Sequence, residues 1–500
     1  MLAVARTFAV LGVEAREVRV EADVQTGLPT FVLSGLPDAA VRESRERVRA
    51  AIVNSGFDFP LKRITANLAP AHLRKAGPGF DLAIAAAVLA ASGQLDSTAL
   101  ADISFTGELA LDGSLRPVPG TLAMAEAVHR TSARAIVVPP GCGPEAALAE
   151  DTTVLPIERL EQLKLLGTDQ EPTPSEPLLL GGNGTATDLP DLADLRGQPY
   201  LRRAVEFAAA GGHSLLITGP PGAGKSMAAR RLPPLLPALA RQEMIEALRV
   251  ASACGKPLDI PAQGRRPFRA PHHTISTAGL VGGGAPPRAG EITLAHRGVL
   301  LLDELPEFRR DALEALRQPL EDGRVLIARA ASVVELPCRF QLVATANPCP
   351  CGRGAASERC ECPSLAIRSH RARISGALAD RIDIAVAVEQ PSAEALAGPP
   401  GETSRQVRER VLAARERQEA RLLPGRCNAE MTPAETRRNS RLDGPAGRLL
   451  ADSERRLALS GRAHERVLRV ARTVADLRGR DRVAAEDVAE ALMVRRRGTW

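Results

Sequence analysis

The sequence predicts a multidomain α/β protein with an α+β amino-terminal domain, a parallel-sheet core and an all-helical carboxyl-terminal region. Three observations predict this class. Val18, Val20 and Ala22 alternate with charged residues as in a half-buried strand, helical stretches alternate with apolar β-rich runs in the middle of the chain, and beyond Pro391 only helical periodicity remains. The expected parts are a domain over 1–166, a linker over 167–188, a core over 189–390 and a helical lid over 391–500.

The composition is that of a globular protein. The chain has 500 residues, 44% of them apolar, which is enough for several cores. Aromatic residues make up only 2%, so recognition of single-stranded bases by stacking is disfavoured. The net charge is +6, and from residue 401 onward 23 Arg stand against 15 Asp plus Glu. This excess fits a polyanionic partner and fits solvated helix faces equally well.

Two further features concern location and redox state. The start of the chain lacks the pattern of a signal peptide, and the longest near-apolar run, 82–91, is too short to cross a bilayer. We therefore expect a cytoplasmic protein without a membrane partner. Four of the eight cysteines fall within 349–362, a distribution that favours metal binding over a disulfide scaffold.

A phosphate-binding loop follows the apolar strand expected over 214–218. Its glycines allow backbone N–H groups to face an anion, and the helix expected after it adds its positive end. Lys225 is one of only five lysines beside 60 arginines, and it would reach the β and γ phosphates of ATP while Ser226 holds Mg²⁺. The loop consists of Gly219, Pro220, Pro221, Gly222, Ala223, Gly224, Lys225 and Ser226.

Two more apolar strands end in polar side chains. The strand from Gly298 is followed by Asp303 and Glu304, an arrangement in which Asp303 coordinates Mg²⁺ and Glu304 orients the attacking water. The strand from Gln341 ends at Asn347, whose amide is expected beside the γ phosphate. Because parallel strands carry their ligands at their carboxyl ends, these residues and Lys225 are predicted to form one catalytic site.

The crowded cysteines are Cys349, Cys351, Cys360 and Cys362. Four thiolates on a short loop suit tetrahedral Zn²⁺. Two interpretations stay open: the number of ligands favours zinc, whereas the two tight C-x-C pairs are also compatible with reduced free thiols.

Nearly the whole chain resembles the magnesium-chelatase-like AAA+ ATPases of the ComM type. The matching stretches are GLPDAAVRESRERVRAAI, APHHTIS, GEITLAHRGVLLLDELPEF and ATANPCPCG. The resemblance implies an amino-terminal domain similar to the Lon protease (ribosomal S5-like) domain, then an AAA+ core and lid. It also implies that Asn347 is sensor 1, that Arg462 offers sensor 2 from the lid to the γ phosphate, and that Arg381 is an arginine finger for a neighbouring subunit. A finger given to a neighbour implies a ring, usually a homo-hexamer.

The segment 323–336 resembles the pre-sensor hairpin of chelatases and replicative helicases, in which a basic residue near the tip meets DNA. Arg329 occupies the similar position; its alternatives are exposure to solvent or a pair with Glu335. His272 and His273 are weaker candidates for a DNA-contacting loop.

The family implies ATP-driven movement on DNA, including helicase activity and branch migration of single-stranded or branched DNA during recombination of transforming DNA. Two alternatives are a chelatase-like motor and a protein-remodelling ATPase. Proteolysis is excluded, because Gly77-Pro78-Gly79 replaces the Lon-type serine context and the lysine partner would fall near Leu122.

Overall fold

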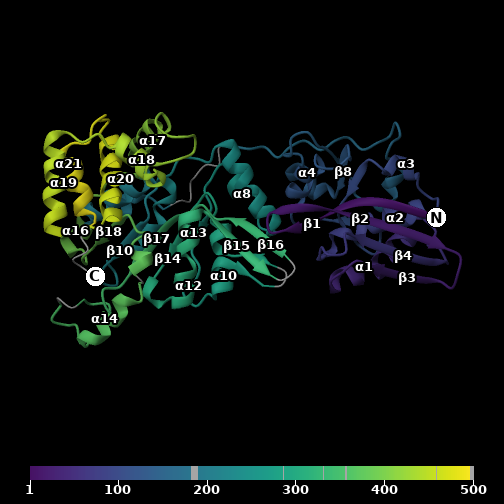
Figure 1. Cartoon of the computed structure of the whole chain (residues 1–500), viewed down its shortest axis with the longest axis horizontal. Helices are drawn as coiled ribbons and strands as arrows, with labels where there is room; N and C mark the ends of the chain where they lie inside the picture. Colours follow the sequence, from purple (N-terminus) through teal and green to yellow (C-terminus); the bar gives the residue numbers. More distant parts are fainter. Residues whose placement is uncertain are drawn as a thin grey trace.

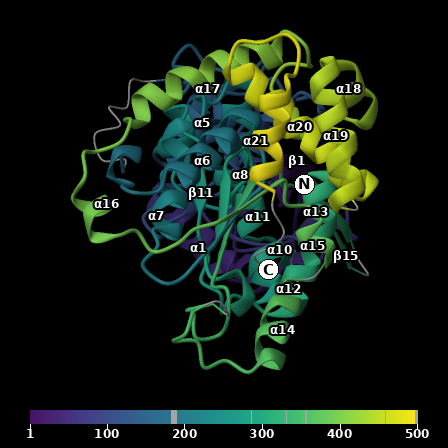
Figure 2. The ribbon, with the colours of Figure 1, turned by 90° about the vertical axis from the view of Figure 1, so that its left-hand side faces the viewer.

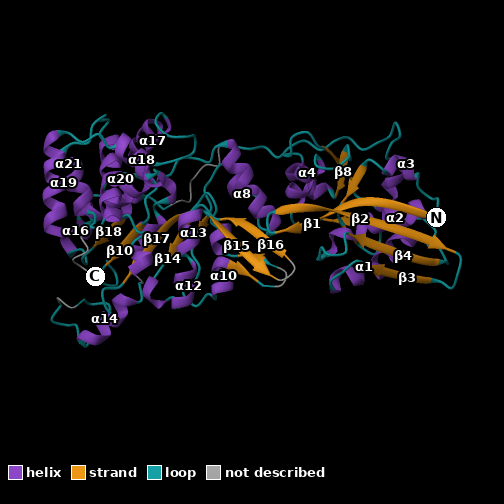
Figure 3. Ribbon diagram, viewed as in Figure 1, coloured by secondary structure: helices purple, strands orange, loops and turns teal. Residues whose placement is uncertain are grey.

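The computed structural model describes residues 1–181, 190–284, 287–329, 332–354, 357–374, 376–457 and 459–495. The molecule is elongated, with the amino-terminal domain at one end, the parallel-sheet core in the middle and the helical region at the other end (Figure 1). Strands occupy the first two parts, and the described carboxyl-terminal part is helical (Figure 3). The predicted mixed α/β class with a parallel sheet and a helical carboxyl-terminal region is confirmed.

The amino-terminal domain is built on a seven-stranded sheet of order β3-β4-β2-β1-β5-β8-β9. The long β1 and β2 form an antiparallel hairpin that turns at Gly12, in the left-handed region at φ 68°. The strands of the seven-stranded sheet are β1 (Leu2–Leu11), β2 (Glu14–Gln25), β3 (Thr30–Ser34), β4 (Arg63–Ala69), β5 (Ile103–Phe105), β8 (Ala135–Val138) and β9 (Thr153–Pro156). The short β6 (Glu108–Leu109) and β7 (Leu115–Arg116) pair with each other in a separate two-stranded sheet. The helices are α1 (Ala39–Asn54), α2 (Asp81–Ala91), α3 (Ser97–Leu100), α4 (Thr121–Val128) and α5 (Gly143–Ala146).

Apolar side chains cover both faces of this sheet. Every residue of α2 is buried, and α2 packs on the valines and alanines that alternate along β2, such as Val18 and Val20. On the other face Phe8 and Ala15 pack against α4. The predicted similarity to the Lon protease domain stays a prediction. Leu122, where the lysine of such an enzyme would fall, is fully buried against Leu248 of the core.

The core contains a five-stranded parallel sheet of order β11-β14-β17-β10-β18. Its central strands are continuous apolar runs, as expected for a sheet covered on both faces. Because β17 lies between β10 and β14, the carboxyl ends of these three strands are adjacent. The strands are β10 (Leu215–Thr218), β11 (Phe268–Arg269), β14 (Val299–Leu302), β17 (Gln341–Ala346) and β18 (Ile384–Ala387).

Helices and two short hairpins surround this sheet. Leu215 and Ile217 of β10 pack in the hydrophobic cluster of α6, whereas Leu216 belongs to the cluster of α12 and the hairpin β15–β16 on the opposite face. The helices of the core are α6 (Pro199–Gly211), α7 (Lys225–Arg230), α8 (Arg241–Ala253), α9 (Asp259–Ala262), α10 (Thr277–Val281), α11 (Glu291–Leu294), α12 (Arg310–Ala315), α13 (Arg317–Asp322), α14 (Ser364–Ala372) and α15 (Gly376–Ala379). The hairpins are β12 (Gly282–Gly283) with β13 (Arg288–Ala289), and β15 (Arg324–Arg329) with β16 (Ser332–Pro337).

The carboxyl-terminal helices share a hydrophobic cluster with the core. Val467, Val470 and Val474 of α20 pack with α6 and with the same face of β10, and Figure 2 shows α17 to α21 grouped on one side of the core. In the described part of the chain, each helix is too short or too polar to span a lipid bilayer. The helices are α16 (Ala393–Ala397), α17 (Ser404–Glu419), α18 (Pro433–Asn439), α19 (Gly444–Leu457), α20 (Gly461–Leu477) and α21 (Ala485–Met493).

Hydrogen bonds between charged side chains and apolar contacts both join the amino-terminal domain to the core. Arg249 on α8 donates two hydrogen bonds of 2.7 Å to the carboxylate of Glu126 on α4. The described part of the predicted linker, 167–181, also reaches this junction: Leu178 and Leu180 pack beside Leu122 and Leu248. The segment is therefore held against both parts.

The close packing at the start of β14 can be tested by a substitution at Gly298. A Cβ placed there would lie 2.0 Å from the backbone oxygen of Pro267, so we expect Gly298→Ala to lower the stability of the core by about 1–3 kcal/mol. Gly447, in α19, has no atom within 4 Å of its added Cβ, and Gly447→Ala should stabilise by about 0.5–1 kcal/mol. Thermal unfolding midpoints of the two variants check this, and equal midpoints would contradict the tight packing at Gly298.

Candidate active site

The loop between β10 and α7 needs glycine for its shape. Gly222 and Gly224 adopt left-handed φ values of 78° and 85°, and a Cβ on Gly219 would lie 2.3 Å from the backbone oxygen of Val388. A tight loop of this kind turns backbone N–H groups toward a bound phosphate. The local structure therefore agrees with the phosphate-binding role that the sequence predicts.

Lys225 joins this loop to the end of β17. Its Nζ donates to the backbone oxygens of Gly219 at 2.7 Å and Pro220 at 2.9 Å, and to Oδ1 of Asn347 at 3.0 Å. Burial lowers the pKa of the Lys225 ammonium, while the carboxylates of Asp303 and Glu304 act in the opposite direction. A cation is thus held where the phosphates of a nucleotide would lie.

A second set of hydrogen bonds joins α7, β14 and β17. Oδ1 of Asp303 accepts hydrogen bonds from the hydroxyls of Ser226 at 2.8 Å and Thr345 at 2.5 Å. The backbone N–H of Glu304 donates to the Thr345 hydroxyl at 3.0 Å. Thr345 thereby fixes both acidic residues of the strand end. The sequence analysis did not identify Thr345. Its position could have indicated it, because residues two apart on a strand project to the same side, and Thr345 lies two residues before Asn347 on an apolar strand.

Glu304 points away from this network. Its backbone is left-handed, at φ 57° and ψ 51°, which is uncommon for a residue with a side chain and costs about 1–3 kcal/mol. Asp303 can therefore face Ser226 while the Glu304 side chain, 52% exposed, reaches solvent. Such a carboxylate is accessible to a water molecule.

His273 lies beside the carboxylate of Glu304. Its Nδ1 is 4.0 Å from Oε2 of Glu304, and its ring contacts those of His272 and Phe308. The sequence suggested only a weak role in a DNA-contacting loop, because residues distant in sequence give no sign that they meet Glu304. The structure adds His273 to the candidate site.

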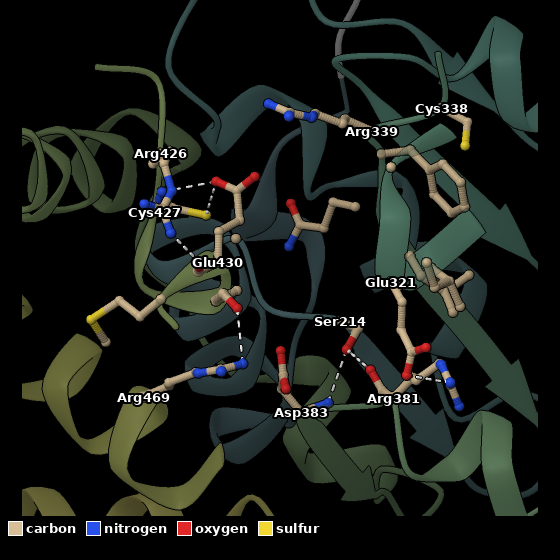
Figure 4. A pocket seen from close by; sticks show the side chains of 18 of the residues that line it. Ser214, Glu321, Cys338, Arg339, Arg381, Asp383, Arg426, Cys427, Glu430 and Arg469 are labelled. Carbon is tan, nitrogen blue, oxygen red and sulfur yellow. Dashed lines mark hydrogen bonds and ion pairs between the residues drawn. The ribbon is translucent and has the colours of Figure 1, made fainter. Parts of the chain in front are cut away.

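Arg381 and Arg462 lie elsewhere, in a cavity of about 680 Å³ between the core and the helical region (Figure 4). The predicted phosphate-loop residues, Asp303, Glu304 and Asn347 are not among its described lining. Arg381 pairs with Glu321, and Arg462 is exposed at the start of α20. The lining includes nine arginines, Arg266, Arg297, Arg339, Arg381, Arg415, Arg426, Arg462, Arg466 and Arg469.

Ser214 connects this cavity to the strand that carries the phosphate loop. Its hydroxyl donates to the backbone oxygen of Arg381 at 2.7 Å and accepts from the backbone N–H of Asp383 at 2.9 Å (Figure 4). Ser214 immediately precedes β10, and Asp383 immediately precedes β18. The backbone at Arg381 is therefore tied to the start of the phosphate-loop strand.

The structure describes the remaining candidate residues to different extents. The backbone of Arg329 ends β15 and pairs with Ser332, and its side chain lies outside the described part of the structure. Glu335, its alternative partner, forms an ion pair with Arg324 at 3.2 Å. The four clustered cysteines come together, with their sulfur atoms within 4.8 Å of one another.

The assembled groups fit a magnesium–nucleotide substrate. The loop and Lys225 suit the phosphates, the oxygens of Ser226 and Asp303 are of the kind that Mg²⁺ prefers, and Glu304 can orient water. Asn347 lies next to Lys225, where it can respond to the terminal phosphate. These groups are of the kinds that nucleotide hydrolysis requires around the phosphates and the attacking water.

Comparison with protein families gives three matches along the chain. Residues 191–396 match the family described as magnesium chelatase, subunit ChlI. Residues 20–141 match subunit ChlI of Mg-chelatase, and residues 401–495 match the ChlI carboxyl-terminal family.

Full-length relatives agree with these matches. The chain is 41% identical to competence protein ComM of Haemophilus influenzae over 98% of this chain and 97% of that protein. It is 40% identical to the uncharacterized protein YifB of Escherichia coli over 99% and 97% of the two chains. An uncharacterized protein of Mycobacterium tuberculosis is 44% identical over 99% of both.

Thr345 offers a test of the hydrogen-bond network. Thr345→Val keeps the shape but leaves Asp303 without one donor and the Glu304 N–H without its acceptor. We expect the rate of ATP hydrolysis to fall about 10–100-fold, as for other partners that orient a metal ligand. Thr7→Val is the matched control, because the buried Thr7 hydroxyl has no hydrogen-bond partner within the described structure. Equal rates for the two variants would show that Thr345 does not orient the acids.

Proposed function

Since this chain belongs to the magnesium chelatase subunit ChlI family of AAA+ ATPases, we propose that it is a ring-forming ATPase that couples ATP hydrolysis to movement on DNA. The observation that carries the ATPase proposal is the meeting of Lys225 with Asn347, and of Ser226 with Asp303, at three adjacent strand ends. Its similarity to a competence protein supports branch migration of recombining DNA as the specific task, performed in the cytoplasm.

The proposed division of labour follows the contacts. Lys225 binds the β and γ phosphates, and Ser226 and Asp303 supply oxygen ligands to the Mg²⁺ of the substrate. Glu304 orients the attacking water and takes up its proton, since its carboxylate is exposed next to Asp303. Asn347 reports the state of the γ phosphate to β17, because its amide already contacts Lys225.

The two arginines that lie apart from these groups support the proposed ring. Arg381 and Arg462 line one cavity together, and that cavity is rich in arginine. A neighbouring copy that presents its phosphate loop to this cavity would receive both arginines, which then neutralise charge on the transferred phosphoryl group. We therefore assign both to the neighbour's nucleotide, within a homo-hexamer. Sequence reasoning had assigned only Arg381 in this way.

DNA is the proposed polymer along which the ATPase moves. The hairpin β15–β16 packs against the core, and Arg329 is the last residue of β15. An arginine at the end of such a strand suits a phosphate contact to single-stranded or branched DNA. The arginine excess beyond residue 401 adds attraction for a polyanion.

Zn²⁺ is the proposed structural cofactor, beside ATP and Mg²⁺. Cys349, Cys351, Cys360 and Cys362 bring four sulfur atoms together, which is the ligand set of a structural zinc site.

The first test measures ATP hydrolysis with and without branched or single-stranded DNA at low salt, where phosphate contacts are strongest. We expect stimulation by DNA in the native chain. Glu304→Gln should lower hydrolysis by about 100-fold or more while ATP still binds, because the water loses its base. Arg329→Ala should lose DNA stimulation but keep the basal rate. Arg310→Ala is its control, since Arg310 is exposed and contacts Glu314 on the same helix.

Stimulation by unfolded polypeptide in place of DNA would favour a protein-remodelling ATPase. The absence of any response to DNA at low salt would contradict the DNA-motor proposal.

The second test asks whether active sites are shared between subunits. Lys225→Ala and Arg381→Ala should each be inactive alone, and mixing them should recover activity, because an intact phosphate loop then meets an intact arginine of its neighbour. Random placement in a closed ring restores about a quarter of the sites. A mixture of Lys225→Ala with Glu304→Gln is the control and should stay inactive, since both defects lie in the same half-site. Failure of the first mixture, with assembly intact, would contradict the shared site.

A further inference from the structure

We propose that the zinc site controls nucleotide binding: a Zn²⁺ ion held by Cys349, Cys351, Cys360 and Cys362 keeps the phosphate loop in the shape that accepts ATP. This proposal rests on the proposed nucleotide and zinc sites. It goes beyond them because it makes nucleotide binding depend on bound zinc. Two contacts carry it, one at Pro221 and one at Lys225.

Three of the four sulfurs are spaced nearly as in a metal centre, and Sγ of Cys362 lies within 4.8 Å of each of them. The Sγ atom of Cys349 lies 3.4 Å from that of Cys351 and 3.8 Å from that of Cys360, and the Cys351 and Cys360 sulfurs are 3.7 Å apart. Tetrahedral zinc with Zn–S bonds of about 2.3 Å separates its sulfurs by about 3.8 Å, whereas a disulfide separates them by about 2.05 Å. All four cysteines are free thiols.

Backbone groups in the same loop contact two of the ligand sulfurs. The N–H of Cys351 donates to Sγ of Cys362 at 3.4 Å, and the N–H of Gly354 donates to Sγ of Cys349 at 3.2 Å. These hydrogen bonds hold both sulfurs within the cluster. An all-sulfur ligand set selects zinc over hard cations such as Mg²⁺.

The first contact with the nucleotide site is made through Asn347, two residues before Cys349. Its side chain accepts from Lys225, and its backbone oxygen contacts Nε2 of His370 at 3.0 Å. His370 lies on α14, which follows Cys362. The segment between Asn347 and His370 is therefore closed by a hydrogen bond at its base and would be closed by the metal within it.

The second contact is made by Gly352, inside the cysteine loop. Its φ of 81° is left-handed, and a Cβ there would lie 2.8 Å from Cδ of Pro221. The backbone of the cysteine loop thus rests directly on a proline of the phosphate loop. Only a glycine fits both the conformation and the approach.

These contacts explain why the metal would matter for ATP. Without the ion, the four thiol groups have no common ligand, and the described residues around Cys349 and Cys351 gain conformational freedom. Gly352 and Asn347 would then no longer be fixed against Pro221 and Lys225. Zinc binding would therefore stabilise the ordered conformation of the phosphate loop.

The test uses the full chain and two readouts, zinc content by elemental analysis and the Kd of a fluorescent ADP analogue with Mg²⁺. We expect one zinc per chain in the native protein. The double variant Cys351→Ser, Cys362→Ser should lose the zinc and bind the analogue at least about tenfold more weakly. Cys254→Ser, a cysteine outside the cluster, should keep both properties.

Gly352→Ala separates the contact from the metal. It retains all four ligands and should keep its zinc, but its methyl group displaces Pro221 and should weaken binding of the analogue several-fold. Because this variant keeps its zinc, weaker binding cannot be attributed to unfolding of a metal-free chain.

The inference is overturned if the native chain holds no zinc, if the zinc-free double variant binds the analogue with native affinity, or if Gly352→Ala does so. Lys225→Ala distinguishes this from failure of the proposed function. If Lys225→Ala weakens binding and zinc loss does not, only the present inference fails; if Lys225→Ala binds normally, the proposed nucleotide site itself is wrong.

Discussion

The structure depends on one constraint: three parallel strands must end side by side so that their polar residues can meet. β17 lies between β10 and β14, and this order allows Thr345 to contact Asp303 on one side while Asn347 contacts Lys225 on the other. A different strand order would separate the cation from the carboxylates. The continuous apolar runs of these strands hold the order, because both faces of the sheet are buried.

The same sheet carries the consequences of hydrolysis outward. Ser214, just before β10, holds the backbone at Arg381, so in the proposed ring a movement of the phosphate-loop strand would reach the arginine that we assign to the next subunit. The lid shares a hydrophobic cluster with one face of β10, so it also responds to that strand. In the proposed ring, a single chain would contribute the phosphate-loop half of one active site and the arginine half of another.

Local sequence patterns were sufficient for much of this account. An apolar run followed by polar residues marked the ends of β10, β14 and β17, because strand, loop and carboxylate are neighbours in the chain. Contacts between distant segments were not predictable in the same way. His273 meets Glu304, and Gly352 meets Pro221, only through the tertiary fold. For Arg462 the motif indicated the residue type, but not the cavity that it shares with Arg381.

We propose that no single chain hydrolyses ATP efficiently, because its phosphate loop needs arginines from a neighbour. The most direct measurement is the ATPase rate per chain across a dilution series, with the size of the assembly determined at each concentration. We expect the rate per chain to fall toward zero as assemblies dissociate into single chains. Single chains that hydrolyse ATP at the rate of the assembled protein would contradict it.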